Sequence, residues 1–314
     1  MVEVSRMPKK KREHVCWGDR YDGWRIKNID PFFFLIPQVM RTRIDSQVFF
    51  QEEISLEPIE RFIREHKNEM PGLSTMHVVA AAMVRMMTQK PCTNRFVVHN
   101  KLYAHKSMSI SIAVKRSLSE DSEETTIKPT FDAMDTLPDI VRKIEEEVQK
   151  ATVDNEESST DNAAKLLSIL PAFLLRFVIR LIFFLDSLGI LPRFLIDLSP
   201  WHTSAWLTNV GSIGMPPVYH HLYEFGTSSV FVSMGRKRSM PAIDFSGNVI
   251  PQRKLGIKVV VDERICDGFY FASALRGFSR LLSKPELLLE PPKERKTDPG
   301  IPQKRIDKAK QNPQ

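Results

Sequence analysis

Residues 258–275 read K-V-V-V-D-E-R-I-C-D-G-F-Y-F-A-S-A-L. The apolar run Val259–Val261 predicts a strand, and the charged turn Asp262–Arg264 ends it. From Phe271 onward, small and apolar residues recur at helical spacing. The stretch therefore predicts a strand, a tight polar turn and a helix. Rigid elements on both sides of such a turn fix its side chains, so these residues are well placed to line a functional site.

The composition is that of a soluble globular protein, since 42% of the 314 residues are hydrophobic and 26% are charged. The net charge of +7 comes largely from basic runs near the two ends, Met7–Arg12 and Lys293–Lys310. Such runs are typical of solvated tails, and nuclear import or nucleic-acid binding is the less favoured interpretation. No aromatic residue is interleaved with them, so we expect no nucleic-acid partner.

Three cysteines, Cys16, Cys92 and Cys266, are widely separated and form no C-x-x-C pair. A sparse, odd set argues against a disulfide framework and is typical of a reducing compartment. The first residues lack the apolar run of a signal peptide, so we expect a cytoplasmic protein. We expect no metal site, because no cysteine or acidic residue stands at ligand spacing from the histidine pair His220–His221.

The chain divides into a polar N-terminal tail (residues 1–25), one folded domain (26–290) and a basic, disordered tail (291–314). Periodicity and turn signals place the regular elements of the domain. We expect strands at about 47–54, 95–98, 101–104, 109–114, 126–129, 205–211, 228–234 and 257–261, and helices at about 55–67, 76–87, 137–150 and 269–282.

An apolar helical insertion interrupts the domain at about residues 163–199. Proline and charged residues divide it, so no uncharged run reaches the roughly 18 residues of a membrane-spanning helix. Two helices broken near Gly189 and Pro192 fit this pattern. Two placements stay open: burial against the domain or a second subunit, and peripheral membrane contact with Arg176 and Arg180 reaching the headgroups.

Three motifs resemble the superfamily of chloramphenicol acetyltransferase and the dihydrolipoamide acyltransferases. Asp267-Gly268 matches the end of the signature H-x-x-x-D-G, and Glu263 stands where the family has its catalytic histidine. Leu207–Gly214 resembles the S-N-L-G segment, and Ser229–Gly235 resembles the strand A-I-L-G-V-G that follows it. The resemblance covers roughly residues 26–285, and its specific motifs all lie after Trp206.

The resemblance implies an α/β fold, a two-layer sandwich of a large mixed sheet and helices. It implies a homotrimer with active sites at the subunit interfaces, which coenzyme A and a small-molecule acceptor enter from opposite ends. It also implies roles for single residues: Thr208 stabilises the oxyanion, Asp267 shapes the turn, and Glu263 occupies the position of the base. The closest comparison is a stand-alone acyltransferase without a lipoyl domain.

The sequence leaves the identity of the base open. A free glutamate titrates near 4.3, well below an imidazole, although burial raises such a value and pairing of Glu263 with Arg264 lowers it. Arg264 has a second candidate partner in Asp267. His221 and His202 are alternative bases, for each of which a packing role is equally open. Adjacent histidines on a strand point to opposite faces, so at most one of His220 and His221 could face a channel.

We therefore expect a coenzyme A-dependent acyltransferase that moves an acyl group from a thioester to an unidentified acceptor. The alternative is a non-catalytic protein of the same fold that binds acyl-CoA or a partner, at a membrane surface in one version. Glu263 separates the two, because only the enzyme needs a base at this position.

Overall fold

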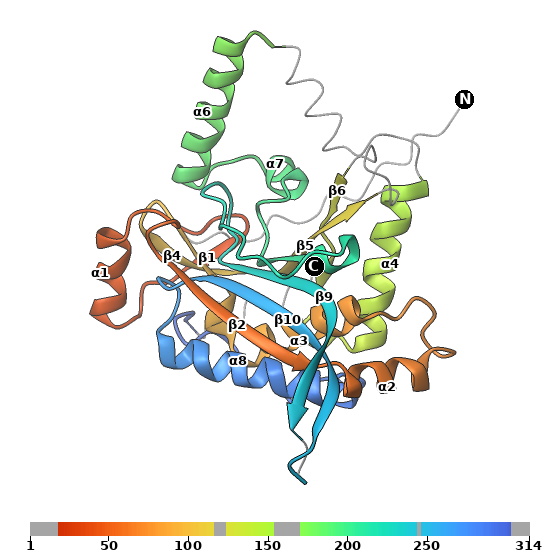
Figure 1. Ribbon diagram of the computed structural model, residues 1–314. Coiled ribbons are helices and arrows are strands. Elements are labelled where there is room, and N and C mark those ends of the chain that lie inside the picture. Colours follow the sequence, from red (N-terminus) through yellow and green to blue (C-terminus); the bar gives the residue numbers. More distant parts are fainter. Residues whose placement is uncertain (1–17, 116–123, 154–169, 244–245, 303–314) are drawn as a thin grey trace.

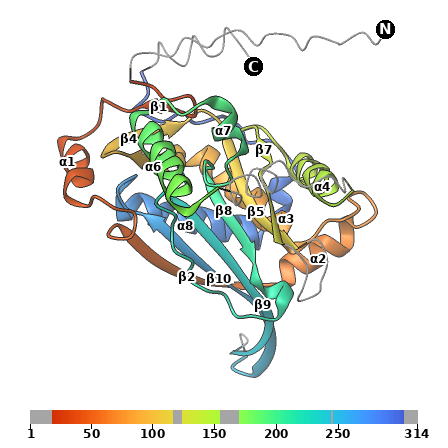
Figure 2. The same cartoon turned by 90° about the horizontal axis from the view of Figure 1, so that it is seen from above.

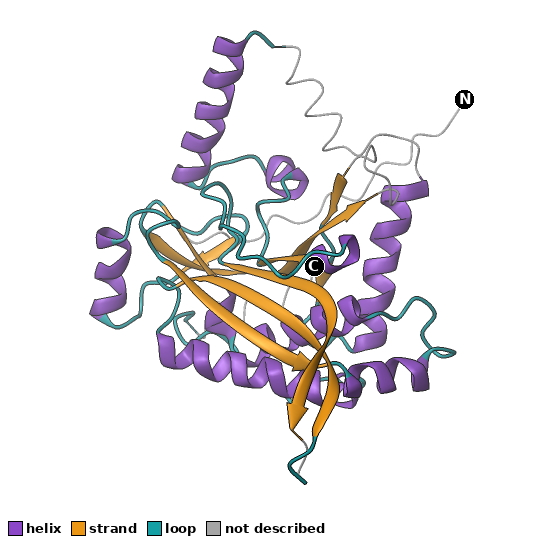
Figure 3. Cartoon of the chain, in the orientation of Figure 1, coloured by secondary structure: helices purple, strands orange, loops and turns teal. Residues whose placement is uncertain are grey.

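The computed structural model describes residues 18–115, 124–153, 170–243 and 246–302. Within them, seven strands form one mixed sheet and three more form a small sheet beside it. Helices cover one face of the large sheet (Figures 1 and 3). The architecture is therefore the two-layer α/β sandwich that the sequence predicts.

The large sheet is antiparallel at both sides and parallel in its middle. Its strand order is β2-β10-β9-β8-β5-β6, and β7 pairs with β5. β8 runs parallel to both of its neighbours, β5 and β9. The strands are β2 (Gln47–Ser55), β5 (Met108–Lys115), β6 (Glu124–Ile127), β7 (Thr130–Phe131), β8 (Ala205–Asn209), β9 (Val230–Ile243) and β10 (Val249–Asp262).

The main core lies between the sheet and its helices. Val259 and Val261 of β10 point into this core, whereas Val260 packs on the opposite face of the sheet. Burial on both faces explains why the run is continuously apolar rather than alternating. The helices that enclose this core are α2 (Glu57–His66), α3 (Thr75–Gln89), α4 (Leu137–Val153) and α8 (Gly268–Ser283). Short 3-10 turns occur at η1 (Pro91–Asn94), η2 (Val210–Ile213) and η3 (Pro285–Leu288).

The small sheet joins β1 (Gly23–Arg25), β4 (Lys101–His105) and β3 (Arg95–Val98). His99 and Asn100 connect β3 to β4 with φ of 47° and 58°. Positive φ at both central residues is the mark of a tight two-residue hairpin turn, so the predicted hairpin is confirmed. Beside this sheet, α1 (Pro31–Val39) begins at Asp30, whose carboxylate accepts a hydrogen bond from the N–H of Phe32.

The insertion forms two helices, α6 (Ala172–Leu188) and α7 (Arg193–Leu198). Gly189 ends α6 in a left-handed conformation with φ of 74°, which confirms the predicted break. Asp186 is the one residue of α6 that is buried, so the helix is not packed into the domain. Residues 163–169 lie outside the described chain. None of the described helices combines the length and apolar character needed to cross a bilayer.

Three boundaries differ from the sequence-based expectation. Residues 18–25, expected in the N-terminal tail, belong to the domain, since β1 pairs with β4 and Arg20 is buried. β9 and β10 continue well past the predicted strands and form a projecting hairpin (Figure 1). Its outer residues, polar and apolar alike, are mostly exposed, so they carry no buried face from which a strand could be predicted. At the C-terminus, the disordered tail was expected from residue 291. Asp298 is instead buried in an ion pair with Arg95, with Nε to Oδ2 at 2.6 Å, and this contact holds residues 291–302 on the domain.

Two buried histidines make stability depend on pH. Burial lowers the pKa of His77 to about 4 and that of His105 to about 4, so both are neutral in the folded protein at pH 7. In the unfolded chain both titrate near 6.5. Their contribution to stability is therefore complete above pH 6.5 and is lost as the pH falls toward 4.

We expect acidification from pH 7 to 5 to lower the free energy of unfolding by about 2 kcal/mol for each of these histidines. Urea unfolding at the two pH values measures this loss. His77→Gln and His105→Gln remove one titrating group each and should each reduce the difference between the two pH values. An unchanged difference in both variants would contradict the assignment.

Candidate functional site

Asp262 is a fully buried carboxylate at the end of β10. Arg264 binds it through two hydrogen bonds, Nε to Oδ1 at 2.8 Å and Nη2 to Oδ2 at 2.7 Å. Arg264 also donates to the carbonyl of Met40. The sequence offered Glu263 and Asp267 as partners of Arg264, and both were wrong. Asp262 lies two residues away with its backbone fixed by the sheet, so it reaches both arms of the guanidinium.

Arg43 is a second buried arginine near Asp262. Its guanidinium donates to the carbonyl oxygens of Tyr223, Glu224, Gly226 and Val97, at 2.6 to 3.0 Å. Burial lowers the pKa of Arg43, which the charge of Asp262 partly offsets. Arg43 thereby connects the loop before β2 to the segment before β9 and to β3.

Glu263 and Asp267 flank the turn after β10. The N–H of Glu263 donates to the carbonyl of Ser46 at 2.9 Å, while its half-buried carboxylate makes no hydrogen bond or ion pair with the described residues. Asp267 is exposed and begins α8 as its N-cap, since its carboxylate accepts from the N–H of Tyr270 at 2.7 Å. Glu263 is thus a carboxylate that is available to a ligand.

Three buried polar atoms without a hydrogen-bond partner lie near this turn: Arg43 Nε, Gln47 Nε2 and Ser229 Oγ. Gln47 is paired with Asp262 across β2 and β10, and the carbonyl of Ser229 accepts the N–H of Asp262. Unsatisfied buried polar groups are uncommon in folded proteins and call for an explanation. Here they give the end of the sheet beside Glu263 the polar character of a ligand site.

Thr208 lies on the face of the sheet opposite to α3 and α8. The register places Thr208 beside Ser233, Ser233 beside Lys258, and Lys258 beside Gln51. These side chains share the face that carries Trp206 and Val260. The Thr208 hydroxyl makes no hydrogen bond with the described residues and can donate one to a ligand. We name this row of four residues the polar row.

Thr208 and Glu263 are not neighbours within one chain. They are two strands apart, and Glu263 lies five residues beyond Lys258, the β10 residue level with Thr208. At ordinary strand spacing and rise, this separation is about 20 Å. The structure therefore does not bring the two predicted groups into one site within a single copy.

His220 and His221 lie between these two ends of the face, in an irregular segment that crosses the sheet. The His220 ring stacks on Phe231 at 4.2 Å and on the ring of His221 at 4.6 Å. The expectation that adjacent histidines diverge was wrong, because it assumed a strand and the backbone here is not one. His221 is exposed and its imidazole is accessible over the same face as Thr208.

Basic side chains continue the polar row toward the tip of the hairpin. Arg238 lies directly opposite Lys254 in the ladder, on the same face as Lys258. Like charges directly opposite one another destabilise a sheet. The other face of the hairpin differs, because Glu60 there pairs with Lys237 and Arg253. The face that carries Thr208 therefore has a positive charge that could bind an anionic ligand.

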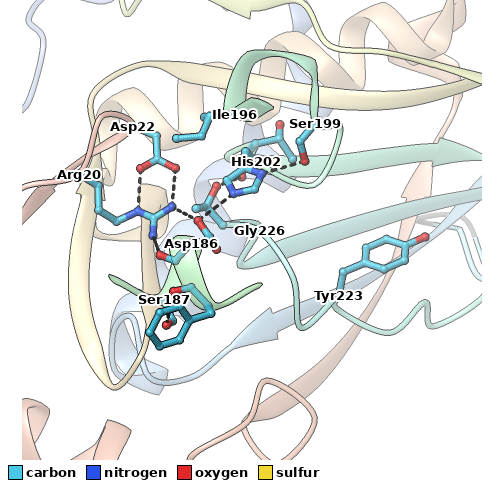
Figure 4. Close-up of polar contacts among 12 residues, drawn as sticks. Arg20, Asp22, Asp186, Ser187, Ile196, Ser199, His202, Tyr223 and Gly226 are labelled. Carbon is cyan, nitrogen blue, oxygen red and sulfur yellow. Dashed lines mark hydrogen bonds and ion pairs between the residues drawn. The ribbon is translucent and has the colours of Figure 1, made fainter. Parts of the chain in front are cut away.

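His202 is excluded as a base by its surroundings (Figure 4). The ring is buried, Nδ1 lies 2.8 Å from Ser199 Oγ, and Nε2 lies 3.1 Å from Asp186 Oδ1. Asp186 is itself bound to Arg20, so both ring nitrogens belong to a closed network. This arrangement of serine, histidine and aspartate resembles a hydrolytic triad in composition only. The network instead holds the C-terminal end of α6 against the domain through Asp186.

The sequence analysis assigned no role to Arg43 or Lys258, although Arg41-Thr42-Arg43 loosely resembles the start of the acyltransferase domains. Lys258 could have been found from strand alternation, since it shares the parity of Val260 and Asp262 along β10. Arg43 could not, because its partners lie more than 50 residues away. Among the described residues no cluster of three or more potential metal ligands occurs, so no metal site is assigned.

Solved structures resemble this fold over most of their length. A probable dihydrolipoamide acetyltransferase from Listeria monocytogenes superposes with a TM-score of 0.54 and 15% identity, covering 86% of this chain and 96% of its own. A chloramphenicol acetyltransferase gives 0.52 and 9%, covering 83% and 99%. A truncated catalytic core of the 2-oxoacid dehydrogenase multienzyme complex from Thermoplasma acidophilum gives 0.51 and 13%, also covering 83% and 99%.

No family model and no curated protein sequence matches the chain. The superpositions establish the fold, but sequence identities of 9 to 15% do not establish the reaction. The protein thus has the fold shared by chloramphenicol acetyltransferase and the catalytic domains of the 2-oxoacid dehydrogenase acyltransferases.

Proposed function

We propose that the protein transfers an acyl group from coenzyme A to a small acceptor. The observation that carries this proposal is the free hydroxyl of Thr208, held on a rigid strand in a row with Ser233 and Lys258. A hydroxyl fixed in this way is suited to stabilise the oxyanion of a tetrahedral intermediate. The shared fold with acyltransferases supports the same reaction class.

In the proposed reaction the acceptor's hydroxyl, thiol or amine attacks the carbonyl carbon of the thioester. A base removes the acceptor's proton, Thr208 donates a hydrogen bond to the oxyanion, and the C–S bond then breaks. The departing thiolate of coenzyme A takes up the proton from the base. Glu263 and His221 are the candidate bases, because each is an accessible, unpaired proton acceptor near this face.

The basic side chains of the same face suit the phosphates of coenzyme A. Lys258, Lys254 and Arg238 follow one another on this face, and Lys258 Nζ lies 4.3 Å from the centre of the Tyr219 ring. Phosphates gain from several cations held on a rigid scaffold. We propose that Lys258, Lys254 and Arg238 bind the phosphate groups of the acyl-CoA.

If Glu263 is the base, the site needs two copies of the chain. Thr208 and Glu263 are about 20 Å apart by strand spacing in one copy, too far to act on one carbonyl. In a symmetric trimer, Thr208 of one copy and Glu263 of its neighbour can meet at an interface. We propose this homotrimer as the active form.

A second candidate function is binding of acyl-CoA or a partner without turnover. The specific observation in its favour is the carboxylate of Glu263 at the position that the resemblance gives to a catalytic imidazole. A carboxylate is a weaker base than an imidazole at neutral pH. The variants below separate the two functions.

Coenzyme A and a panel of acyl-CoA esters should stabilise the protein. At 100 times its dissociation constant, a ligand adds about 2.7 kcal/mol to the free energy of unfolding, which thermal unfolding detects. Lys258→Gln should weaken this effect, whereas Lys284→Gln, an exposed lysine on the helix side of the sheet, should leave it unchanged. A well-folded protein that shows no shift with any thioester would exclude acyl transfer and acyl-CoA binding, and would leave only binding of a partner.

Removing the Thr208 hydroxyl should slow acyl transfer by roughly 100- to 1000-fold, because an oxyanion donor is lost. Thr208→Val is the test and Thr208→Ser the control that keeps the hydroxyl. Glu263→Gln and His221→Asn each remove one candidate base, and release of free coenzyme A thiol measures turnover. A fall of about 100-fold or more identifies the base. If neither variant slows turnover, neither Glu263 nor His221 is the base and the proposed mechanism is wrong.

Mixed trimers test whether the site spans two copies. Thr208→Val and Glu263→Gln chains are each expected to be inactive alone. After unfolding and refolding together, about a quarter of the interfaces should combine an intact Thr208 with an intact Glu263 and recover that fraction of activity. No recovery, in mixtures shown by native mass spectrometry to exchange chains, would contradict the shared site.

A further inference from the structure

The helix α6 carries a large apolar surface that the described chain leaves uncovered. Phe173, Phe177, Phe184 and Leu188 are 75%, 62%, 57% and 53% exposed. Figure 1 shows α6 projecting away from the large sheet, and Figure 2, seen from above, shows the helix over the part of the molecule that carries β1 and β4. A soluble monomer rarely exposes a contiguous apolar patch of this kind, so the surface points to a binding partner.

Five of the exposed apolar side chains of α6 gather on one face of the helix, while Ile179 and Phe183 lie outside it and Phe183 stacks on Phe225 at 4.6 Å. At 3.6 residues per turn, Phe173, Phe177, Leu181, Phe184 and Leu188 fall within an arc of about 80°. This five-residue surface is the outer face of α6. Arg176 and Arg180, which are both exposed, border this arc on one side. An apolar face rich in phenylalanine and leucine with arginines along its edge is typical of helices that lie in a membrane interface.

The base of α6 is rigidly held, so the helix is kept in its projecting position. Arg20 binds Asp186 through Nη2 to Oδ1 at 2.5 Å and Nη1 to the carbonyl at 2.6 Å, and His202 adds a contact of 3.1 Å (Figure 4). Burial by itself lowers the pKa of Arg20, but the nearby carboxylates of Asp22 and Asp186 raise it above its ordinary value. Breaking such a buried pair is costly, so α6 does not simply detach.

The charges of α6 identify the partner more closely. Asp186 is the one acidic residue of the helix, and its carboxylate is buried and bound. Arg176 and Arg180 make no hydrogen bond or ion pair with the described residues. The outer face is therefore bordered by two positive charges that no carboxylate of the described residues balances. A complementary partner supplies anionic groups next to an apolar layer, as a bilayer of acidic phospholipids does.

A second copy of the chain fits this surface less well. A two-fold interface brings a patch against itself, and so would bring Arg176 and Arg180 close to their own copies without an acidic residue between them. Like charges brought together in a poorly solvated contact oppose association. Lipid headgroups carry the missing negative charge and leave the arginines hydrated.

We propose that α6 binds the surface of an anionic phospholipid bilayer, with its outer face in the boundary between headgroups and acyl chains and with Arg176 and Arg180 at the phosphates. A helix of 17 residues is about 25 Å long, shorter than the roughly 30 Å of a hydrocarbon core. The helix therefore lies in the interface and does not span it. This attachment is independent of acyl transfer.

Flotation of the full chain with lipid vesicles tests the proposal. The vesicles contain phosphatidylcholine alone or with about one third phosphatidylglycerol, and the bound fraction gives the partition coefficient. The wild-type protein should bind the anionic vesicles more tightly by about tenfold or more, since each arginine near such a surface adds to binding. Failure of the wild-type protein to bind anionic vesicles would overturn the proposal.

Matched variants separate the contributions of the two parts of the surface. Phe177→Asp should lower the partition coefficient by at least about tenfold, while Phe269→Asp, at an 81% exposed aromatic on α8, should leave it unchanged. Arg176→Gln with Arg180→Gln should remove the preference for anionic lipid and keep the fold. Binding of Phe177→Asp at the wild-type level would contradict the assignment of α6.

Sedimentation velocity without lipid tests the alternative that a second copy of the chain covers α6. If Phe177→Asp changes the oligomeric state while neither protein binds vesicles, a second copy covers α6 and the proposal fails. Thr208→Val should bind vesicles like the wild-type protein. Lipid attachment and acyl transfer can therefore fail separately.

Discussion

The buried charge of Asp262 is the constraint on which the rest of the structure depends. Its carboxylate is fully enclosed at the end of β10 and needs compensation that water cannot give. Arg264 supplies two direct hydrogen bonds and Arg43 a second nearby positive charge. Arg43 in turn holds the backbone at Tyr223–Gly226 and at Val97. If Arg43 or Arg264 were removed, the charge of Asp262 would lose part of its compensation. The small sheet, the segment Tyr223–Gly226 and the turn that carries Glu263 would then lose contacts that hold them in place.

This arrangement divides the candidate chemistry between two places. The end of β10 carries Glu263 and several incompletely bonded polar atoms, whereas the polar row carries Thr208 and the basic residues. A sheet is stiff, so the distance between these places cannot close by small side-chain movements. A site that used both Thr208 and Glu263 would therefore need a second copy of the chain, and α6 is anchored separately through Asp186.

The sequence predicted those features that depend on neighbours a few residues apart. The run Val259–Val261 gave the buried strand, His99-Asn100 gave the hairpin, and Gly189 gave the break in the insertion. It did not predict the outer half of the β9–β10 hairpin, where polar and apolar residues alike are mostly exposed and present no buried face. It also missed the docking of residues 291–302, because Asp298 meets Arg95 across 203 positions of chain.

The fold class and the order of its motifs followed from periodicity, turn chemistry and family resemblance, all of which are properties of short stretches. The choice of ion-pair partners did not. Arg264 could reach three carboxylates by sequence distance, and strand register selected Asp262. The same register set Thr208 in line with Ser233 and Lys258 and far from Glu263. Local sequence fixes what each element is, but contacts between elements arise only when the chain closes on itself and long-range packing chooses among the possible partners.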